Sequence, residues 1–272
     1  INYVSVPIRM RDQPDWSSRT MENYLVSEGN IMSRLATAPT DNYLTELRSL
    51  EIGDERYLLG FYSQSKRPQI EGLYFSNVTE VEGHISTKLI EIPDELLNAY
   101  EVKYKNPITS LWGKPGVQIV KMEDGELMII LDFNDLYVFR LDAQLNVKWI
   151  RKLPKLNLYE SSTRGATYEY QFIQDKHVFV VVDNPENNDL DAQSPAYYSG
   201  YKLRKDILRA FIIDEDGEVS QKVVTHFLDI KGYEPKKFLL RTDLFSLSNG
   251  KFLFKVYTKD KENILVKFEV FD

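Results

Sequence analysis

The feature that most constrains the fold is a hairpin pattern that recurs along the chain. The segment LYVFRLDAQLNVKWIRKL (Leu136–Leu153) aligns with LRAFIIDEDGEVSQKVVT (Leu208–Thr225), and in this alignment Asp142 matches Asp214. Each segment has an alternating apolar run, a short polar turn that begins with the aspartate, and a second run, which is the pattern of a β-hairpin. The recurrence predicts repeated units of antiparallel strands.

Further hairpins precede and follow these two. Turn signals interrupt the apolar runs at Asp124-Gly125, Gln174-Asp175 and Asn249-Gly250. Asn-Gly is a strong hairpin signal because both residues tolerate positive φ. Grouping the hairpins gives four units of up to four strands each, at about 43–92, 117–153, 169–227 and 242–271.

Recurring four-stranded meanders are typical of β-propeller blades. We therefore predict an all-β, propeller-like chain with four recognisable blades in a single domain over residues 1–272. A β-sandwich stays the alternative.

The ends of the pattern are less regular. The unit at 242–271 has room for three strands only. We expect the N-terminal INYVSVPIRM (Ile1–Met10) to pair with it and close the ring of blades, which would remove two open sheet edges. The rest of residues 1–42 is expected to be irregular, with a short helix within 18–35. A second helical turn is expected at Pro93–Tyr100, where acids occupy the first turn.

Composition excludes several classes of function. The net charge is −7 and no long basic run could neutralise phosphates, so we expect no nucleic-acid partner. The chain has no cysteine, which excludes disulfides and thiol catalysis. No apolar run approaches the ~20 residues of a membrane span, so we expect no transmembrane segment. The three histidines are not spaced as metal ligands, and glycine-rich phosphate loops and a G-x-S-x-G elbow are absent.

Three stretches, GFYSQSKRPQIEGLYF, LDAQLNVKWIRKLP and HVFVVVDNPENN, resemble uncharacterised exported propeller-like proteins of Bacteroidetes. The resemblance covers residues 43–272 and implies a propeller-like fold and a periplasmic or extracellular location, but no catalytic residue. The turn from Asp142 to Trp149 also resembles the tryptophan-containing repeats of quinoprotein propellers. The matching position in the next unit is Gln221, so no quinone cofactor is expected.

Loop lengths indicate which ends of the strands are functional. Antiparallel alternation brings four long connections to the same strand ends, whereas the opposite ends are closed by tight turns. These connections are 93–116, 154–168, 184–206 and 228–241. Long connections are often functional, and tyrosine, tryptophan and arginine give much contact energy per side chain. The candidate ligand-binding residues on this basis are Trp112, Tyr159, Arg164, Tyr168, Tyr197, Tyr198, Tyr201 and Tyr233.

The connection after Val182 is rich in acids and amides. Carboxylates of Asp183, Glu186, Asp189 and Asp191 could bind a hard cation such as Ca²⁺, although the loop lacks the glycine of an EF-hand. A solvated acidic loop that binds no metal is the alternative, and no other cofactor is expected.

The function remains open between two classes. The first is a non-catalytic envelope module that binds a glycan, peptide or protein on its loop face. The second is a propeller-type hydrolase or lyase that acts on a carbohydrate with carboxylates near a central channel. Because the chain begins at Ile1, we expect that an upstream segment was removed, and the protein is either free or anchored in the envelope through that segment.

Overall fold

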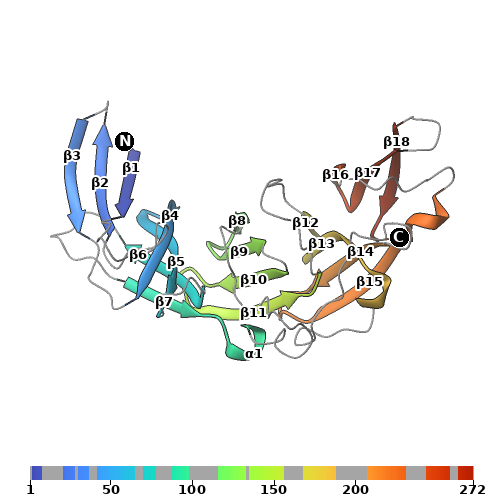
Figure 1. Cartoon of the computed structure of the whole chain (residues 1–272), viewed down its shortest axis with the longest axis horizontal. Helices are drawn as coiled ribbons and strands as arrows, with labels where there is room; N and C mark the ends of the chain where they lie inside the picture. Colours follow the sequence, from blue (N-terminus) through green and yellow to red (C-terminus); the bar gives the residue numbers. More distant parts are fainter. Residues whose placement is uncertain are drawn as a thin grey trace, which may run out of the picture. The chain divides into compact units, whose positions relative to one another are not determined.

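The structure is a computed structural model of the 272-residue chain, and all its described strands pair antiparallel. The described residues are 2–7, 21–27, 30–36, 42–64, 70–77, 87–97, 116–132, 135–155, 168–187, 207–230, 243–257 and 263–271. The strands form five sheets, three with four strands and two with three, and consecutive strands are neighbours in every sheet (Figure 1). The prediction of an all-β chain built from meanders is therefore confirmed.

The first two sheets come from the N-terminal part of the chain. The first contains β1 (Asn2–Pro7), β2 (Met21–Ser27) and β3 (Asn30–Ala36). The second contains β4 (Tyr43–Ile52), β5 (Glu55–Ser63), β6 (Gly72–Asn77) and β7 (Thr87–Glu91), and the short helix α1 (Asp94–Leu97) follows it. The helical turn expected near residue 93 is thus confirmed for its described part.

The remaining three sheets lie further along the chain. One contains β8 (Gly116–Lys121), β9 (Leu127–Asp132), β10 (Leu136–Leu141) and β11 (Val147–Leu153). The next contains β12 (Tyr168–Ile173), β13 (Lys176–Asp183), β14 (Ile207–Ile213) and β15 (Val219–His226), with the 3-10 turns η1 (Pro185–Asn187) and η2 (Phe227–Asp229). The last contains β16 (Asp243–Ser246), β17 (Lys251–Tyr257) and β18 (Asn263–Glu269).

Two expectations about the N-terminal segment are wrong. The helix expected within 18–35 is a β-hairpin, since β2 pairs with β3. Tyr24, Val26 and Ile31 have high β-propensity, and Gly29 disfavours the interior of a helix. The N-terminal strand was expected to join the last unit, but β1 pairs with β2 from Asn2–Val26 to Pro7–Met21. A partner that is near in sequence costs less loop entropy than a distant one.

The chain divides into two compact units. Unit 1 contains residues 1–114 with the turns 122–126 and 142–145, and unit 2 contains residues 115–121, 127–141 and 146–272. A single domain over the whole chain stays a prediction.

In unit 1 the described core comes from the middle strands β5 and β6. Gly72 at the start of β6 shows how tightly they pack, because a Cβ there would lie 2.2 Å from the Ile90 carbonyl oxygen and 2.5 Å from the Tyr62 ring. Burial raises the pKa of Tyr62 to about 12, and the nearby carboxylates of Glu91 and Glu71 add to the shift. The tyrosine therefore stays protonated and acts as a packing residue.

In unit 2 the three sheets are packed through two apolar cores. Met128, Val138 and Trp149 pack against Phe179 and Phe211, which joins the sheet β8–β11 to the sheet β12–β15. A second core joins the sheet β12–β15 to the sheet β16–β18; its members include Val178, Val180, Leu208, Phe227, Phe252 and Phe254. The middle sheet is therefore covered on both faces, which explains why β13 and β14 are apolar along almost their whole length.

The recurring hairpin turns occupy equivalent positions. The turns at Asp142 and at Asp214 each connect the third and fourth strands of a four-stranded sheet. In each, the aspartate carbonyl accepts a bond from a residue with positive φ, Leu145 (φ 62°) or Gly217 (φ 83°). The predicted repeat of the hairpin is therefore confirmed in the topology.

The two repeats differ at Trp149, which corresponds to Gln221 in the second repeat. Its Nε1 donates to the Glu215 carbonyl oxygen at 3.1 Å, and a Cβ on Gly217 would lie 2.7 Å from its ring. Arg151 on the same strand donates to the Gly217 carbonyl oxygen at 2.6 Å. The tryptophan thus holds the turn of the following sheet. The matching residue Gln221 contacts Arg209 within its own sheet instead.

Candidate functional site at the connection end of unit 2

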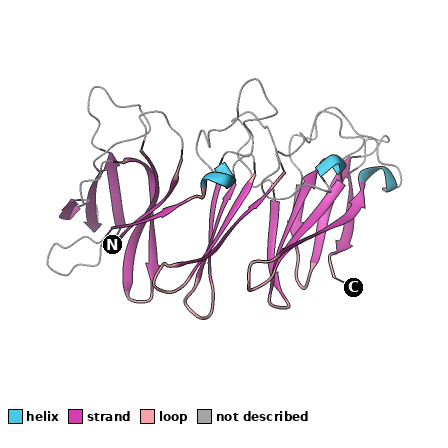
Figure 2. Cartoon of the chain, turned by 90° about the horizontal axis from the view of Figure 1, so that it is seen from below, coloured by secondary structure: helices cyan, strands magenta, loops and turns pink. Residues whose placement is uncertain are grey.

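The sheets of unit 2 have two different ends. At one end, here the turn end, short turns join β12 to β13, β14 to β15 and β16 to β17. At the other, here the connection end, the chain leaves the sheets after Leu153, Asp183 and His226, and both η1 and η2 lie there (Figure 2). The buried polar residues of unit 2 fall into one cluster at each end.

The connection-end cluster is built around Asp183 and Arg209, both essentially inaccessible to solvent. Arg209 Nε lies 2.9 Å from Asp183 Oδ2. The other carboxylate oxygen, Oδ1, accepts bonds from the Asn184 backbone at 2.7 Å and from Asn187 Nδ2 at 2.6 Å. The aspartate that ends β13 therefore ties the first turn of the 184–206 connection to the sheet.

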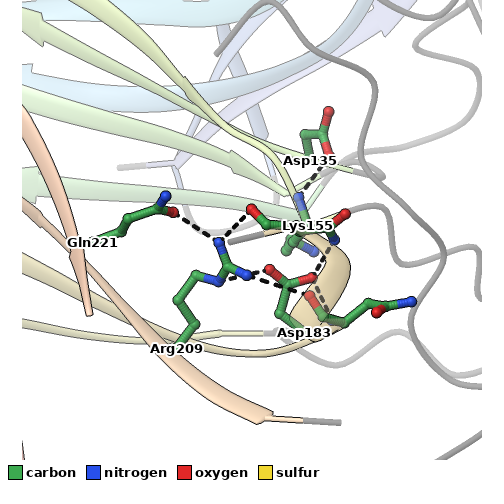
Figure 3. Close-up of polar contacts among 7 residues, drawn as sticks. Asp135, Lys155, Asp183, Arg209 and Gln221 are labelled. Carbon is green, nitrogen blue, oxygen red and sulfur yellow. Dashed lines mark hydrogen bonds and ion pairs between the residues drawn. The ribbon is translucent and has the colours of Figure 1, made fainter. Parts of the chain in front are cut away.

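Arg209 reinforces this attachment with its remaining donors (Figure 3). Nη1 donates to the carbonyl oxygen of Asn187 and to Oε1 of Gln221, both at 2.7 Å, and Nη2 lies 3.3 Å from the Asn184 carbonyl oxygen. The guanidinium thus binds two backbone carbonyls, a carboxylate and an amide, which uses the forked donor geometry that lysine lacks.

Two further ion pairs belong to the same cluster and come from the sheet β8–β11. Lys155 Nζ lies 2.8 Å from Asp132 Oδ1, and the Lys155 backbone donates to Asp135 Oδ1 at 2.9 Å (Figure 3). Lys152 Nζ lies 3.7 Å from Asp135 Oδ2, and neither side chain is exposed. The cluster therefore pairs three carboxylates with three cations, and its formal charge is zero.

Burial perturbs Asp183 in particular. Removal from water raises its pKa to about 7, although the Arg209 guanidinium and the bonds from Asn187 and Asn184 favour the charged form. The carboxylate of Asp135 adds a smaller shift in the same direction as burial. The charge of Asp183 therefore depends on Arg209 remaining in place.

The turn-end cluster contains Arg140, Trp149, Tyr170 and His177. Arg140 Nη1 lies 2.8 Å from His177 Nε2, and Tyr170 Oη lies 3.0 Å from His177 Nδ1. Because a guanidinium can only donate, Nε2 accepts, so the neutral ring carries its proton on Nδ1 and donates it to the tyrosine oxygen. Burial, followed by the charge of Arg140, lowers the pKa of His177 to about 4.

The first strands of the last two sheets are joined by polar side chains of β12. Gln171 Nε2 donates to Ser246 Oγ at 2.5 Å and to the Lys251 carbonyl oxygen at 3.0 Å, while its Oε1 accepts from Gly250. Glu169 accepts from the Ser246 backbone at 3.1 Å, and burial raises the pKa of this carboxylate despite that bond.

A pocket of about 490 Å³ opens nearby at the turn end. It is lined by Phe172, Ile173, Gln174, Asn249, Lys251, Glu269 and Phe271.

Few of the predicted site residues fall within the described part of the chain. Tyr168 is buried and its hydroxyl donates to Gln118 Oε1 at 2.9 Å, so its ring packs between sheets. Asp183 lies in the connection-end cluster, and the backbone of Glu186 lies in η1. The others lie outside the described residues: Trp112, Tyr159, Arg164, Asp189, Asp191, Tyr197, Tyr198, Tyr201 and Tyr233.

Sequence reasoning missed most of the connection-end cluster. Arg209 interrupts the apolar run ILRAFII, and Asp132 and Asp183 each end an apolar run. A charged residue inside a strand with two covered faces needs a buried partner, and that was the available signal. Which charges pair could not be read from the sequence.

Within the described residues no group of three or more histidine, cysteine, aspartate or glutamate side chains is arranged to hold a metal ion. The same part of the chain has no helix long and apolar enough to cross a membrane.

Comparison with known proteins gives distant likenesses only. No protein-family model and no curated protein matches the chain. A protein of unknown function from Bacteroides caccae has 9% identity over 94% of this chain and 87% of its own, with a TM-score of 0.28. A bifunctional GH43-CE protein from Bacteroides eggerthii has 14% identity over 97% of this chain and 31% of its own, with a TM-score of 0.32.

A subtype N10 neuraminidase-like protein of A/little yellow-shouldered bat/Guatemala has 11% identity over 84% of this chain and 60% of its own, with a TM-score of 0.30. At these TM-scores the likenesses do not show the fold or the function of this chain.

Proposed function

We propose that the chain is a propeller-like, non-catalytic binding module that takes a glycan, peptide or protein ligand at the connection ends of its sheets. We propose in addition that it works in the periplasm or outside the cell, as its resemblance to exported proteins implies.

The observation that carries the proposal is the connection-end cluster. Arg209 and Asp183 bind the backbone of Asn184 and the side chain and backbone of Asn187, so the entry to the 184–206 connection is held by buried charges. A connection that carries no function can leave its carbonyls in water, whereas one that presents side chains to a ligand benefits from a rigid base. That connection contains Tyr197, Tyr198 and Tyr201.

A hydrolase or lyase acting on a carbohydrate is the second candidate. It is favoured by one observation, the gathering of Asp132, Asp135 and Asp183 at the connection end. Each of the three aspartates is paired with a lysine or an arginine, and Asp135 and Asp183 are buried. Buried, paired carboxylates suit a structural role better than proton transfer to a substrate. Calcium binding at Asp183 stays a prediction, although protein groups already engage both of its oxygens.

The test combines glycan and peptide arrays with two variants. Replacing Tyr197 and Tyr198 together with alanine should weaken binding of any array hit at least tenfold, roughly the loss of one good aromatic contact. The unfolding midpoint in urea should stay unchanged. Phe172→Ala is the matched control, because Phe172 is an exposed aromatic residue (45%) at the turn end.

Loss of binding in Phe172→Ala, or an unfolding shift with intact binding in the tyrosine variant, would overturn the proposal. Release of reducing ends from a polysaccharide that disappears in Asp132→Asn would instead establish the enzyme.

A further inference from the structure

The last sheet differs from its four-stranded counterparts in its third strand. In the sheets β4–β7, β8–β11 and β12–β15 the third strand, β6, β10 or β14, pairs on both edges and is buried along almost its whole length. In β18 the residues from Ile264 to Glu269 alternate between half-buried and exposed, and Leu265 is 61% exposed. Among the described residues no strand pairs with the second edge of β18.

A strand edge that has no partner among the described residues offers a row of backbone donors and acceptors to another strand. The inner face of β18 already belongs to the second core of unit 2, where Ile264, Val266 and Phe268 pack. Phe268 stacks on Phe252 with ring centroids 5.5 Å apart. A strand added at this edge would therefore extend an existing core.

The sequence of β18 is complementary to itself when two copies run antiparallel about Val266. In that register Ile264 lies opposite Phe268 of the second copy, so the inner face gains apolar pairs. On the outer face Leu265 lies opposite Lys267 of the second copy, whose aliphatic stem can cover it. Between Ile264 and Phe268 no like charges face each other in this register.

We propose that β18 is a dimerisation edge, at which two copies of the chain pair β18 with β18 antiparallel about Val266. Such an interface is isologous and closes as a two-fold dimer, so it does not lead to open fibres. It joins two three-stranded sheets into one continuous six-stranded sheet. The residues that pair in this dimer, from Ile264 to Phe268, are not among the proposed ligand-binding residues.

The first experiment measures the molar mass of the whole chain by sedimentation equilibrium over a wide concentration range. A reversible dimer is expected. Leu265→Lys would place a lysine opposite Lys267 at two symmetry-related positions and should raise the dimer dissociation constant about tenfold. Leu265→Glu would place a carboxylate opposite the same lysine and should lower the dimer dissociation constant. Leu265 is exposed, so both variants should fold, which circular dichroism can check.

The matched control is Phe245→Lys. Phe245 is 47% exposed on β16, the opposite edge strand of the same sheet, so this variant has the same change of charge and should keep the dimer. A register test uses the absence of native cysteines. In the proposed pairing, residue 266 of each copy faces its equivalent at the ~4.5–5.5 Å between opposite Cα atoms, which permits a disulfide.

Oxidation of Val266→Cys should therefore give a covalent dimer. A chain that stays monomeric at every concentration, a dimer that Leu265→Lys leaves intact, or a Val266→Cys variant that oxidises only as slowly as Phe245→Cys would each overturn the proposal.

Discussion

The connection-end and turn-end clusters of unit 2 are both built on an arginine of a third strand, but the two arginines bind different groups. Arg209 binds a carboxylate and the carbonyls of Asn184 and Asn187. Arg140 binds the neutral ring of His177. In the connection-end cluster, positive and negative side chains are paired and their formal charges cancel. In the turn-end cluster, a single cation, Arg140, lies beside the uncharged ring of His177.

The difference follows from how the chain leaves each end. At the turn end the backbone satisfies its own groups, as in the bond from Gly217 N to Asp214 O at 3.0 Å. At the connection end β13 stops at Asp183, and the carbonyls of Asn184 and Asn187 need donors from elsewhere. A buried arginine supplies them, and the buried arginine in turn needs a carboxylate. At this end Arg209 therefore takes the role that backbone donors have in a hairpin turn.

The largest expected effect is in the connection-end cluster. Arg209→Met would leave the Asp183 carboxylate buried without its cation and two carbonyls without donors, so unfolding should become easier by about 3–5 kcal/mol. Arg140→Met is the matched control, because His177 stays neutral and keeps its bond to Tyr170, and its cost should be about 1–2 kcal/mol. Urea unfolding of both variants measures the difference. Equal losses of stability in the two variants would contradict the difference drawn between the two clusters.

A second test uses pH at the turn end. The pKa of His177 is lowered to about 4 from an ordinary value of 6.5, so between these values the unfolded chain binds a proton that the folded chain does not. Stability should therefore fall as the pH drops from 6.5 to 4, by about 3 kcal/mol if this histidine acts alone. His177→Gln should flatten this part of the stability curve, whereas His226→Gln, at an exposed position, should not.

A third test concerns Asp183, for which the expected effect of pH has the opposite sign. Its folded pKa is raised to about 7, so below pH 7 the folded chain binds more protons than the unfolded chain, and this group favours folding as the pH falls towards 4. Comparing the pH dependence of the stability of Asp183→Asn with that of the parent chain isolates the contribution of Asp183. A variant that gains stability from acid more strongly than the parent would contradict this assignment.

Local features of the fold could be predicted from the sequence, and long-range ones could not. The turns at Asp142, Asp214 and Asn249 were predictable because a few adjacent residues determine them. The hairpin of β2 and β3 was not predicted because neither strand alternates regularly between apolar and polar residues. The pairing of Asp183 with Arg209 depends on which strands become neighbours across a long connection, and no spacing rule contains that information.

The meander order of the sheets also bears on how the chain folds. Every described strand pairs with its neighbour in sequence, so each sheet can form from local contacts, which favours fast folding for an all-β protein. Among the described pairs, β13 and β14 are separated by the longest connection, residues 184–206. The entropy of closing a loop grows only with the logarithm of its length, so even this connection adds little to the barrier. The greater hazard is kinetic: hairpins as similar as those of Asp142 and Asp214 can exchange partners, which is a common source of misfolding in repeat proteins.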